Sequence, residues 1–506
     1  MSAATQERTD PQAGAGEPDP RRWKALSICL IAGFMTLLDV SIVNVALDSI
    51  RTGVHATESD LQWVVSGYAL TFGLVLVPAG RLGDARGRRP VFIFGLALFT
   101  AASAACGLAP TAFTLIVARL VQGIGGGFLT PQISGIIQNS FRGKERGKAF
   151  GRFGLTVGLS TAVGPVVGGL LIKAFGVGEG WRWIFFVNLP VGIVAMVLAH
   201  KVIAHQARTK AERGKQDLDP VGVVLLGAAV IMLLLPFVEE QQWHGSAKWL
   251  LLVPAALSLV SYLLWERRYG RQGKQPVVDL ELFRIRSYSL GASLGLLYFA
   301  GFTGIFFTYT LFLQSGLHYT ALVAGLAVTP FALGTAIAAP LGGRRVTEVG
   351  RPLVAVGLAM VVAGLVGTWI AVQQVPGHDI GWVTVAPLLF AGLGSGLVIT
   401  PNITLTLAEA PVARAGSAGG VLQTGQRIGS AAGIAAIGSV FFSHVASSRG
   451  DYAVAFRDAL VVITIFIVLA LAVALLDVVT GRGARAAGRA ERSGSAVAGA
   501  HHAQVT

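Results

Sequence analysis

Two charged side chains lie inside long apolar stretches of the chain. Asp39 belongs to a stretch that begins near residue 24, and Arg119 to one that begins near residue 112. A charged side chain at the centre of a bilayer costs about 2.5–3.5 kcal/mol on insertion scales, so such residues are candidates for function. Burial disfavours the charged form of a carboxyl group, whereas a neighbouring cation favours it. We predict that Asp39 carries protons beside Arg119; a static ion pair between two helices is the alternative.

A loop with a regular pattern of glycines and charges separates two further apolar stretches. It reads GRLGDARGRRP over residues 80–90. Its carboxylate can accept hydrogen bonds from the N-terminus of a neighbouring helix and can pair with an arginine four residues later. The loop is predicted to latch two halves of the protein together; alternatively, its basic residues only mark the cytoplasmic side. The residues assigned to this latch are Gly80, Asp84, Gly87, Arg88 and Arg89.

The apolar stretch that begins near residue 148 is rich in glycine. Glycines lower helix propensity and expose a flat face on which another helix can pack closely. A proline within the stretch removes a backbone N–H and favours a bend. We predict that this helix is a hinge, with ordinary small-residue packing as the alternative. The hinge residues are Gly158, Gly164, Pro165, Gly168 and Gly169.

Polar and aromatic residues scattered through the apolar stretches are candidates for the lining of a substrate cavity. An amide side chain within a membrane helix makes a helix–helix contact about as often as a ligand contact. No single residue of this set therefore identifies a cavity. Arg427 is a further cation in an apolar stretch, and the sequence does not name its partner. The predicted cavity residues are Asn44, Trp63, Tyr68, Gln122, Gln132, Gln314, Asn402 and Gln423.

Transmembrane helices must position all of these residues. Of the 506 residues, 53% are hydrophobic and 13% are charged, and the charged share is about half that of soluble domains. A membrane span needs about twenty mostly apolar residues, and fourteen such stretches can be placed. Lys and Arg gather in every second connection, which predicts that both termini are cytoplasmic. The stretches begin near residues 24, 61, 90, 112, 148, 182, 219, 247, 289, 320, 351, 381, 417 and 455.

A faint internal repeat predicts how these helices are organised. Residues 342–352 read GGRRVTEVGRP, have the same length as the loop at 80–90, and also separate two apolar stretches. This register predicts an all-α membrane protein with a 6+2+6 plan, in which two helices are inserted between parallel six-helix bundles. The predicted parts are a disordered cytoplasmic tail (1–23), the N-terminal bundle (24–200), linkers with the inserted helices (201–288), the C-terminal bundle (289–480) and a second disordered cytoplasmic tail (481–506).

The loop at 80–90 resembles the signature loop of the major facilitator superfamily, with Gly83 where alanine is common. Four further segments resemble motifs of its fourteen-span drug:proton antiporters: LDVSIVNVAL (38–47), RLVQGIGGG (119–127), GLSTAVGPVVGG (158–169) and WRWIFFVNLP (181–190). The first departs from the family pattern at Ser41, where Thr is usual, and is followed by Asp48, where Pro is usual. The resemblance implies proton-coupled export of antibiotics or other amphipathic drugs by alternating access at a bacterial plasma membrane, which would confer resistance.

Other classes of function receive less support from the sequence. The chain has no G-x-x-x-x-G-K-[ST] phosphate loop, so an ATP-driven pump is not expected. Apart from the adjacent His501 and His502, its histidines are isolated, and no H-E-x-x-H motif occurs, so no enzyme activity, cofactor or metal ion is expected. The formal net charge of +14 comes from short clusters between apolar stretches, which does not favour nucleic-acid binding. The expected partners are a small-molecule drug, protons and the lipid bilayer; transport of one metabolite, sugar or siderophore is the alternative.

Overall fold

The computed structural model describes residues 20–176, 178–203, 219–238, 246–272, 274, 278, 280–375, 377–411, 414–448 and 450–502, with side chains as far as residue 480. These residues form helices and no strand. Within them, thirteen helices are long and apolar enough to cross a membrane, and Pro220–Leu233 is a shorter apolar helix. The predicted all-α class is confirmed.

The first half of the chain forms six long helical segments. Gly87, at a φ of 96°, separates the second segment from the third in a conformation that favours glycine. Thr57 and Thr111 each accept a hydrogen bond from a backbone N–H three residues later and so cap a helix. The segments are α1 (Arg22–Val45), α3 (Glu58–Arg86), α4 (Arg88–Leu108), α5 (Ala112–Ser140), α6 (Gly143–Phe175) and the pair α7 (Gly180–Phe186) and α8 (Asn188–Val202); α2 (Leu47–Val54) joins α1 to α3.

The second half repeats this arrangement. Gly350, at a φ of 69°, separates α13 from α14 as Gly87 separates α3 from α4. The helices are α12 (Arg286–Leu311), which continues as the π-helix η3 (Phe312–Gly316), α13 (Ala321–Val349), α14 (Arg351–Gln374), α15 (Ile380–Val383), α16 (Val385–Thr406), α17 (Ala415–Ser447) and α18 (Tyr452–His502).

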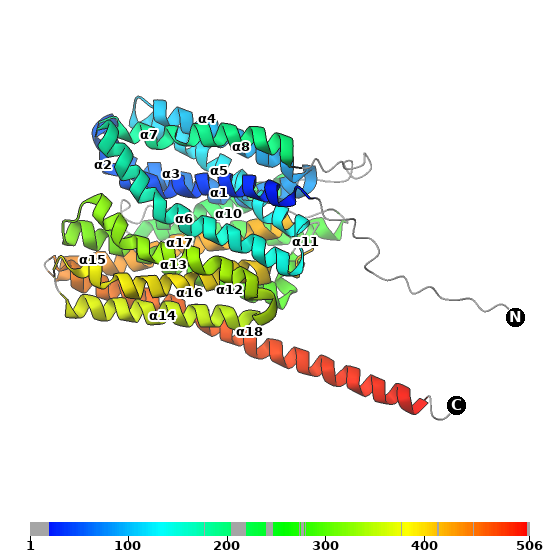
Figure 1. The fold of residues 1–506 in the computed structure, drawn as a ribbon. Coiled ribbons are helices and arrows are strands. Elements are labelled where there is room, and N and C mark those ends of the chain that lie inside the picture. Colours follow the sequence, from blue (N-terminus) through cyan, green and yellow to red (C-terminus); the bar gives the residue numbers. More distant parts are fainter. Residues whose placement is uncertain are drawn as a thin grey trace.

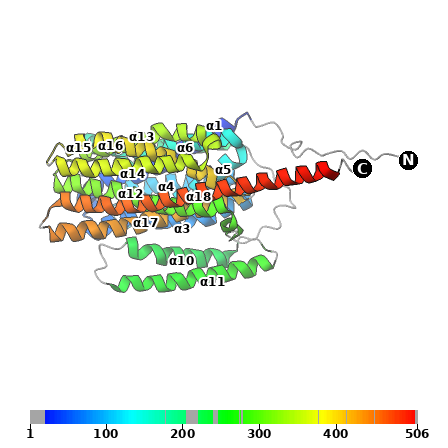
Figure 2. The same ribbon diagram turned by 90° about the horizontal axis from the view of Figure 1, so that it is seen from below.

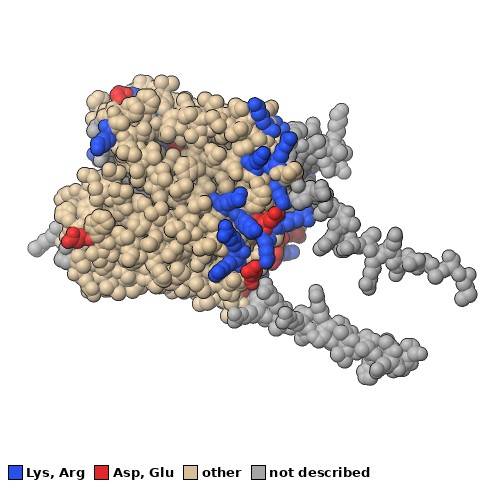
Figure 3. Space-filling model, in the orientation of Figure 1, with Lys and Arg blue, Asp and Glu red and all other residues tan. Residues whose placement is uncertain are grey.

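The two halves lie side by side with their helices roughly parallel (Figure 1). They meet along two seams, one between α6 and α13 and the other between α3 and α17. α1 begins and α18 ends at the same end of the molecule (Figure 1). Lys and Arg also gather there (Figure 3), and we call it the basic end. Exposed residues that mark it include Arg86, Arg142, Lys144, Arg344 and Arg345.

Two helices between the halves form a separate layer (Figure 2). They are α10 (Pro220–Val238) and α11 (Leu252–Arg271), which follows the short helix η1 (Ser246–Leu251). The Trp265 indole donates a hydrogen bond of 2.9 Å to Asp219 Oδ1 and so ties the pair together. Val230 of α10 packs in one apolar cluster with Leu70 of α3 and Ile428 of α17. α10 therefore lies across the α3–α17 seam.

The helix boundaries agree closely with the predicted stretches; α6 begins at Gly143, five residues before its predicted start near residue 148, and α11 begins at Leu252, five residues after its predicted start near 247. The C-terminus differs more. α18 continues as helix to His502, over most of the segment 481–506 that was predicted to be a disordered tail. Alanine and arginine, which are abundant there, are strong helix formers. The predicted N-terminal tail falls largely outside the described residues, as do residues 204–218 near the start of the region predicted to hold linkers and the inserted helices (201–288).

Candidate functional site

The Asp39 carboxylate is completely buried in α1, with 0% of the residue exposed. Arg119 Nη1 of α5 lies 2.6 Å from Asp39 Oδ2. Gln122 Nε2 and Asn188 Nδ2 donate to Asp39 Oδ1 at 2.9 and 3.0 Å. Three donors from α5 and α8 therefore hold one carboxylate.

Further hydrogen bonds fix the residues that hold Asp39. Arg119 Nε donates to the carbonyl of Val64 at 3.0 Å, and its guanidinium lies 4.2 Å from the centre of the Tyr68 ring. Ser103 Oγ of α4 accepts from Gln122 and Asn188 at 3.1 and 3.0 Å. Five helices thus contribute to one connected polar network within an apolar bundle, which defines a single arrangement of its members.

The network also leaves part of the carboxylate unused. An ionised carboxylate offers about four lone-pair sites, and three of them accept the bonds from Arg119, Gln122 and Asn188. Rotation of the Gln122 or Asn188 amide by half a turn would replace an N–H donor with a carbonyl oxygen.

The structure brings Asp39 and Arg119 together, as the sequence predicts, and adds two partners that the sequence analysis did not assign. Asn188 lies within the WRWIFFVNLP segment, which the sequence analysis identified as a motif without assigning a role to the asparagine. Ser103 lies in a stretch of alanines and has no sequence signal of its own.

The predicted latch loop contacts the start of α17. Asp84 Oδ1 accepts from the backbone N–H of Gly416 at 3.0 Å, and Oδ2 accepts from the N–H of Ser417 at 2.8 Å and from its hydroxyl at 3.0 Å. Arg88 Nη2 donates to Asp84 Oδ1 at 2.7 Å. A Cβ at Gly80 would lie 2.4 Å from the carbonyl oxygen of Gly416, so the backbones approach very closely here. Both residues of the ion pair are buried, and they join the two halves at the basic end.

Two more contacts join the halves at the same end. Gln138 of α5 donates to the carbonyl of Ala415 at 3.3 Å. Lys144 of α6 lies 2.8 Å from Glu348 of α13, on the surface. Together with the Asp84 contacts, they close the basic end in this conformation. Arg89, also assigned to the latch, instead donates to the carbonyl of His200 within the first half.

The glycine-rich helix α6 packs against α13, but its glycines do not all face the same neighbour. A Cβ at Gly158 would lie 2.6 Å from the backbone nitrogen of Ala336, and one at Gly169 would lie 3.2 Å from Leu322. Gly164 and Gly168 face α1 instead. Pro165 lies within the continuous helix. α6 is therefore packed closely on two sides, against its own half and against the other.

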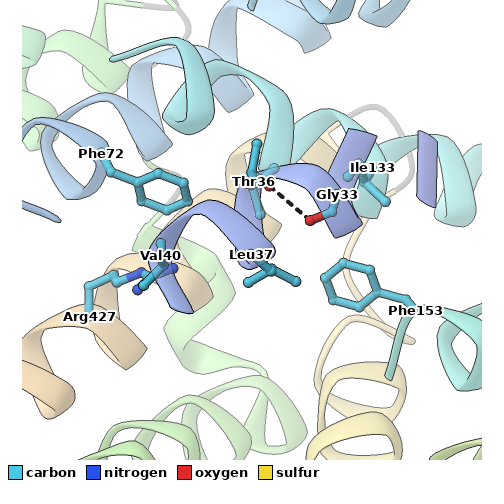
Figure 4. Close-up of a pocket in the computed structure, with 9 residues that line it drawn as sticks. Gly33, Thr36, Leu37, Val40, Phe72, Ile133, Phe153 and Arg427 are labelled. Atoms are coloured by element: carbon cyan, nitrogen blue, oxygen red, sulfur yellow. Dashed lines mark hydrogen bonds between the residues drawn. The ribbon is translucent and has the colours of Figure 1, made fainter. Parts of the chain in front are cut away.

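A small cavity of about 30 Å³ lies between α1, α3, α5, α6 and α17 (Figure 4). The walls are mainly apolar, and Arg427 of α17 supplies the charge. The lining residues are Gly33, Thr36, Leu37, Val40, Phe72, Thr130, Ile133, Phe153 and Arg427. None of the eight predicted cavity residues is among them.

Most of the predicted cavity residues serve other contacts. Gln132 donates to the carbonyl of Ala79 at 2.8 Å. Asn402 accepts from Arg351 Nη1 at 2.7 Å, in a cluster where Arg351 also pairs with Asp477 at 2.6 Å. Gln423 donates to Ser134 across the α5–α17 contact at 3.1 Å. In all three cases the amide side chain satisfies a neighbouring polar group at a helix contact and does not line the cavity.

The remaining five are equally dispersed. Gln122 belongs to the Asp39 network, and Tyr68 lies against the Arg119 guanidinium. Asn44 is exposed, whereas Trp63 and Gln314 are half-buried. Among the described residues, no group of three or more His, Cys, Asp or Glu side chains could hold a metal ion.

The comparisons with known proteins agree with this fold. The family model described as the Major Facilitator Superfamily matches residues 29–434. The chain belongs to the major facilitator superfamily. This match covers both halves of the fold, from α1 into α17, and confirms the resemblance seen in the latch loop.

Several relatives within the major facilitator superfamily are named for antibiotics. A probable actinorhodin transporter of Streptomyces coelicolor is 34% identical over 442 residues, which cover 86% of this chain and 76% of the relative. A puromycin resistance protein of Streptomyces alboniger is 33% identical over 440 residues, covering 86% and 85%. A multidrug resistance protein of Mycobacterium tuberculosis is 34% identical over 412 residues, covering 80% and 73%. The resemblance to drug exporters is thereby confirmed, and the protein is a multi-pass plasma-membrane transporter of bacterial type.

Solved major facilitator structures share the architecture at low identity. The human organic anion transporter MFSD10 aligns with a TM-score of 0.65 at 14% identity, covering 90% of this chain and 100% of the other. The proton:xylose symporter XylE aligns with a TM-score of 0.62 at 16% identity, covering 90% and 95%. At these identities the likeness shows the fold alone.

Proposed function

We propose that this protein is a proton-coupled antiporter that exports antibiotics or other amphipathic drugs and so confers resistance to them. The observation that carries the proposal is the Asp39 carboxylate, fully buried in a membrane helix and held by donors from two other helices. A charge in hydrocarbon is costly, and a carboxylate that binds and releases a proton is one established use of such a charge. The antibiotic and multidrug relatives support drugs as the cargo.

The proposal includes a topology of fourteen spans in a 6+2+6 plan with cytoplasmic termini. The thirteen long apolar helices and the shorter one at Pro220–Leu233 supply the spans. An even number of crossings accounts for α1 beginning and α18 ending at one end (Figure 1). The concentration of Lys and Arg at that end favours the cytoplasm as its location (Figure 3). The layer formed by α10 and α11 represents the inserted pair.

In this mechanism, the contacts of Asp84 with α17 hold the cytoplasmic side closed. Proton binding to Asp39 rearranges its amide partners and releases Arg119, which alters the packing of α1 against α5 and α8. α6 remains packed on α13 and serves as the axis about which the halves rock. When the latch opens, the cavity widens toward the cytoplasm and takes up the drug, and Asp39 loses its proton there.

The test compares Asp39→Asn with the wild type in proteoliposomes. Asn keeps the size and an acceptor oxygen but cannot gain or lose a proton at neutral pH. We expect Asp39→Asn to lose drug accumulation driven by a pH gradient yet to retain exchange of labelled for unlabelled drug, because exchange needs no net proton movement. Asp379→Asn is the matched control: Asp379 is exposed and makes no side-chain cap bond at α15.

A susceptibility panel in a pump-deficient host identifies the drug used in the liposomes. Resistance should fall with Asp39→Asn or with a protonophore and should persist with Asp379→Asn. Gradient-driven accumulation that survives in Asp39→Asn would remove the assignment of Asp39. Drug transport in the wild type without any proton movement would remove antiport altogether.

A further inference from the structure

Arg427, a half-buried arginine of α17, differs from three other arginines that are buried or half-buried between helices. Arg119, Arg88 and Arg351 each pair with a carboxylate of this chain, at 2.6, 2.7 and 2.6 Å. In the part of the chain that the structure describes, Arg427 makes no ion pair and no side-chain hydrogen bond; its guanidinium lies 4.5 Å from the centre of the Phe72 ring. Arginine stays charged in proteins and offers five N–H donors, so this cation lacks an anion.

Arg427 borders the cavity between the two halves. Figure 4 shows its side chain reaching from α17 toward Val40 of α1 and Phe72 of α3. The hydroxyls of the two lining threonines are already used, since Thr36 donates to the carbonyl of Gly33 at 2.9 Å and Thr130 to that of Gly126 at 3.1 Å. Among the lining side chains, Arg427 therefore offers the unused hydrogen-bond donors, and the other walls are apolar or aromatic.

We propose that Arg427 binds the anionic group of the exported drug, so that the preferred cargo is an amphipathic organic anion with a carboxylate or phenolate on an aromatic body. The guanidinium matches a carboxylate in a paired, two-bond geometry. Phe72 and Phe153 supply the apolar surface for the body. This inference rests on the proposed export function and narrows it, because an apolar cavity alone would accept cations equally well.

The cavity as it stands does not admit such a molecule. Its volume of about 30 Å³ is far below the roughly 300–1,000 Å³ of drug-sized ligand pockets. Because Phe153 and Val40 lie in the first half and Arg427 in the second, separation of the halves enlarges the space. Arg427 would then meet the cargo as the basic end opens.

The charge of the cargo also sets the electrical signature of exchange. One proton moving inward against one monoanion moving outward transfers two positive charges inward. A neutral drug transfers one, and a monovalent cation transfers none. An anion exporter therefore gains from a membrane potential that is negative inside, in addition to the pH gradient.

The experiment measures equilibrium binding of two dyes to the purified protein in nanodiscs. Fluorescein and rhodamine 123 share a xanthene scaffold but carry opposite charge. The variants are Arg427→Gln and Arg427→Lys, and Arg152→Gln is the matched control, because Arg152 also stacks on an aromatic ring, Trp23 at 4.2 Å, but lies outside the cavity. Thermal unfolding of each variant reports folding.

We expect the wild type and Arg152→Gln to bind fluorescein at least tenfold more tightly than rhodamine 123. Arg427→Gln should lose about tenfold to a hundredfold in fluorescein affinity, as charge-assisted hydrogen bonds are removed, and should keep or improve its affinity for rhodamine 123. Arg427→Lys should fall between the two, because lysine keeps the charge without the paired geometry.

Equal fluorescein affinity in Arg427→Gln and Arg152→Gln would overturn the proposal, as would a wild type that binds rhodamine 123 better or binds neither dye. If Arg427→Gln fails to fold, the ratio of the two affinities in Arg427→Lys decides, since a ratio unchanged from the wild type overturns the paired geometry. Binding needs no proton gradient. The binding test of anion selectivity can therefore support this inference even if the Asp39 test refutes antiport. Failure of the inference and failure of the proposed function are thus distinguishable.

Discussion

Loss of one carboxylate oxygen at Asp84 should open the basic end. Asp84→Asn keeps the size of the side chain but replaces an acceptor with an NH₂ group. If the NH₂ group takes the place of Oδ2, both bonds from Ser417 are lost; if it takes the place of Oδ1, the bonds from Gly416 and Arg88 are lost. Hydrogen bonds to a charged group contribute about 1.5–3 kcal/mol each, and those that remain are then made to a neutral acceptor.

The net loss is about 2–4 kcal/mol from the closed state, because the bonds from Gly416 and Ser417 cross between the halves and the open state does not make them. At 1.4 kcal/mol per factor of ten, the closed-to-open ratio should fall roughly 30- to 700-fold. The assay is the rate at which a membrane-impermeant maleimide labels Thr130→Cys, a cavity position, in inside-out vesicles. The native cysteines Cys29 and Cys106 are buried, and both are replaced in the background.

Labelling should be faster in Asp84→Asn than in the parent, with Asp379→Asn unchanged. If Asp84→Asn inserts and binds drug as the parent does but is labelled at the parental rate, the contacts with α17 do not hold this end closed. Faster labelling from the opposite side of the membrane would also refute the reasoning, since it would place the gate at the wrong end.

Three further outcomes follow from close contacts. Gly158→Ala places a Cβ 2.6 Å from a backbone nitrogen of α13, and this overpacking should cost about 1–3 kcal/mol in thermal unfolding and slow transport; Gly425→Ala, with no atom within 4 Å, should do neither. Gly135→Ala places a Cβ 1.2 Å from the guanidinium of the latch arginine and should raise maleimide labelling in the same direction as Asp84→Asn. Asp477→Asn removes the carboxylate that pairs with the half-buried Arg351 and with Arg286, and should cost about 1.5–3 kcal/mol in thermal unfolding; an unchanged melting temperature would show that these pairs contribute little.

The sequence predicts the helices and the main ion pair for the same physical reason. Hydrocarbon penalises polar groups strongly, so a long apolar stretch can hardly be anything but a span, and a charge within it is conspicuous. Asp39 and Arg119 could therefore be singled out without knowing how their helices pack. The contact between Asp84 and a helix N-terminus could be named because one turn of sequence carries both the carboxylate and its arginine.

The cavity could not be predicted in this way. Whether an amide such as Gln132 or Asn402 faces a cavity or a neighbouring helix depends on the rotation of each helix about its axis, and small and apolar residues surround both positions. Ser103 was missed because a serine costs little in a membrane helix and so leaves no pattern. Arg427 was recognised as a cation in an apolar stretch, but only the packing of α17 against α3 and α5 shows that it borders a cavity.

The position of α10 across the α3–α17 seam bears on how cargo gains access. When two halves separate within a bilayer, the gap between them would ordinarily be exposed to lipid tails. The tails could fill the gap, or hydrophobic molecules could enter it laterally from the membrane. Here α10 already covers that gap and contacts both halves through aliphatic side chains. When the latch opens, this flank would widen behind a protein wall, so that the route on this side leads to water and excludes the membrane interior.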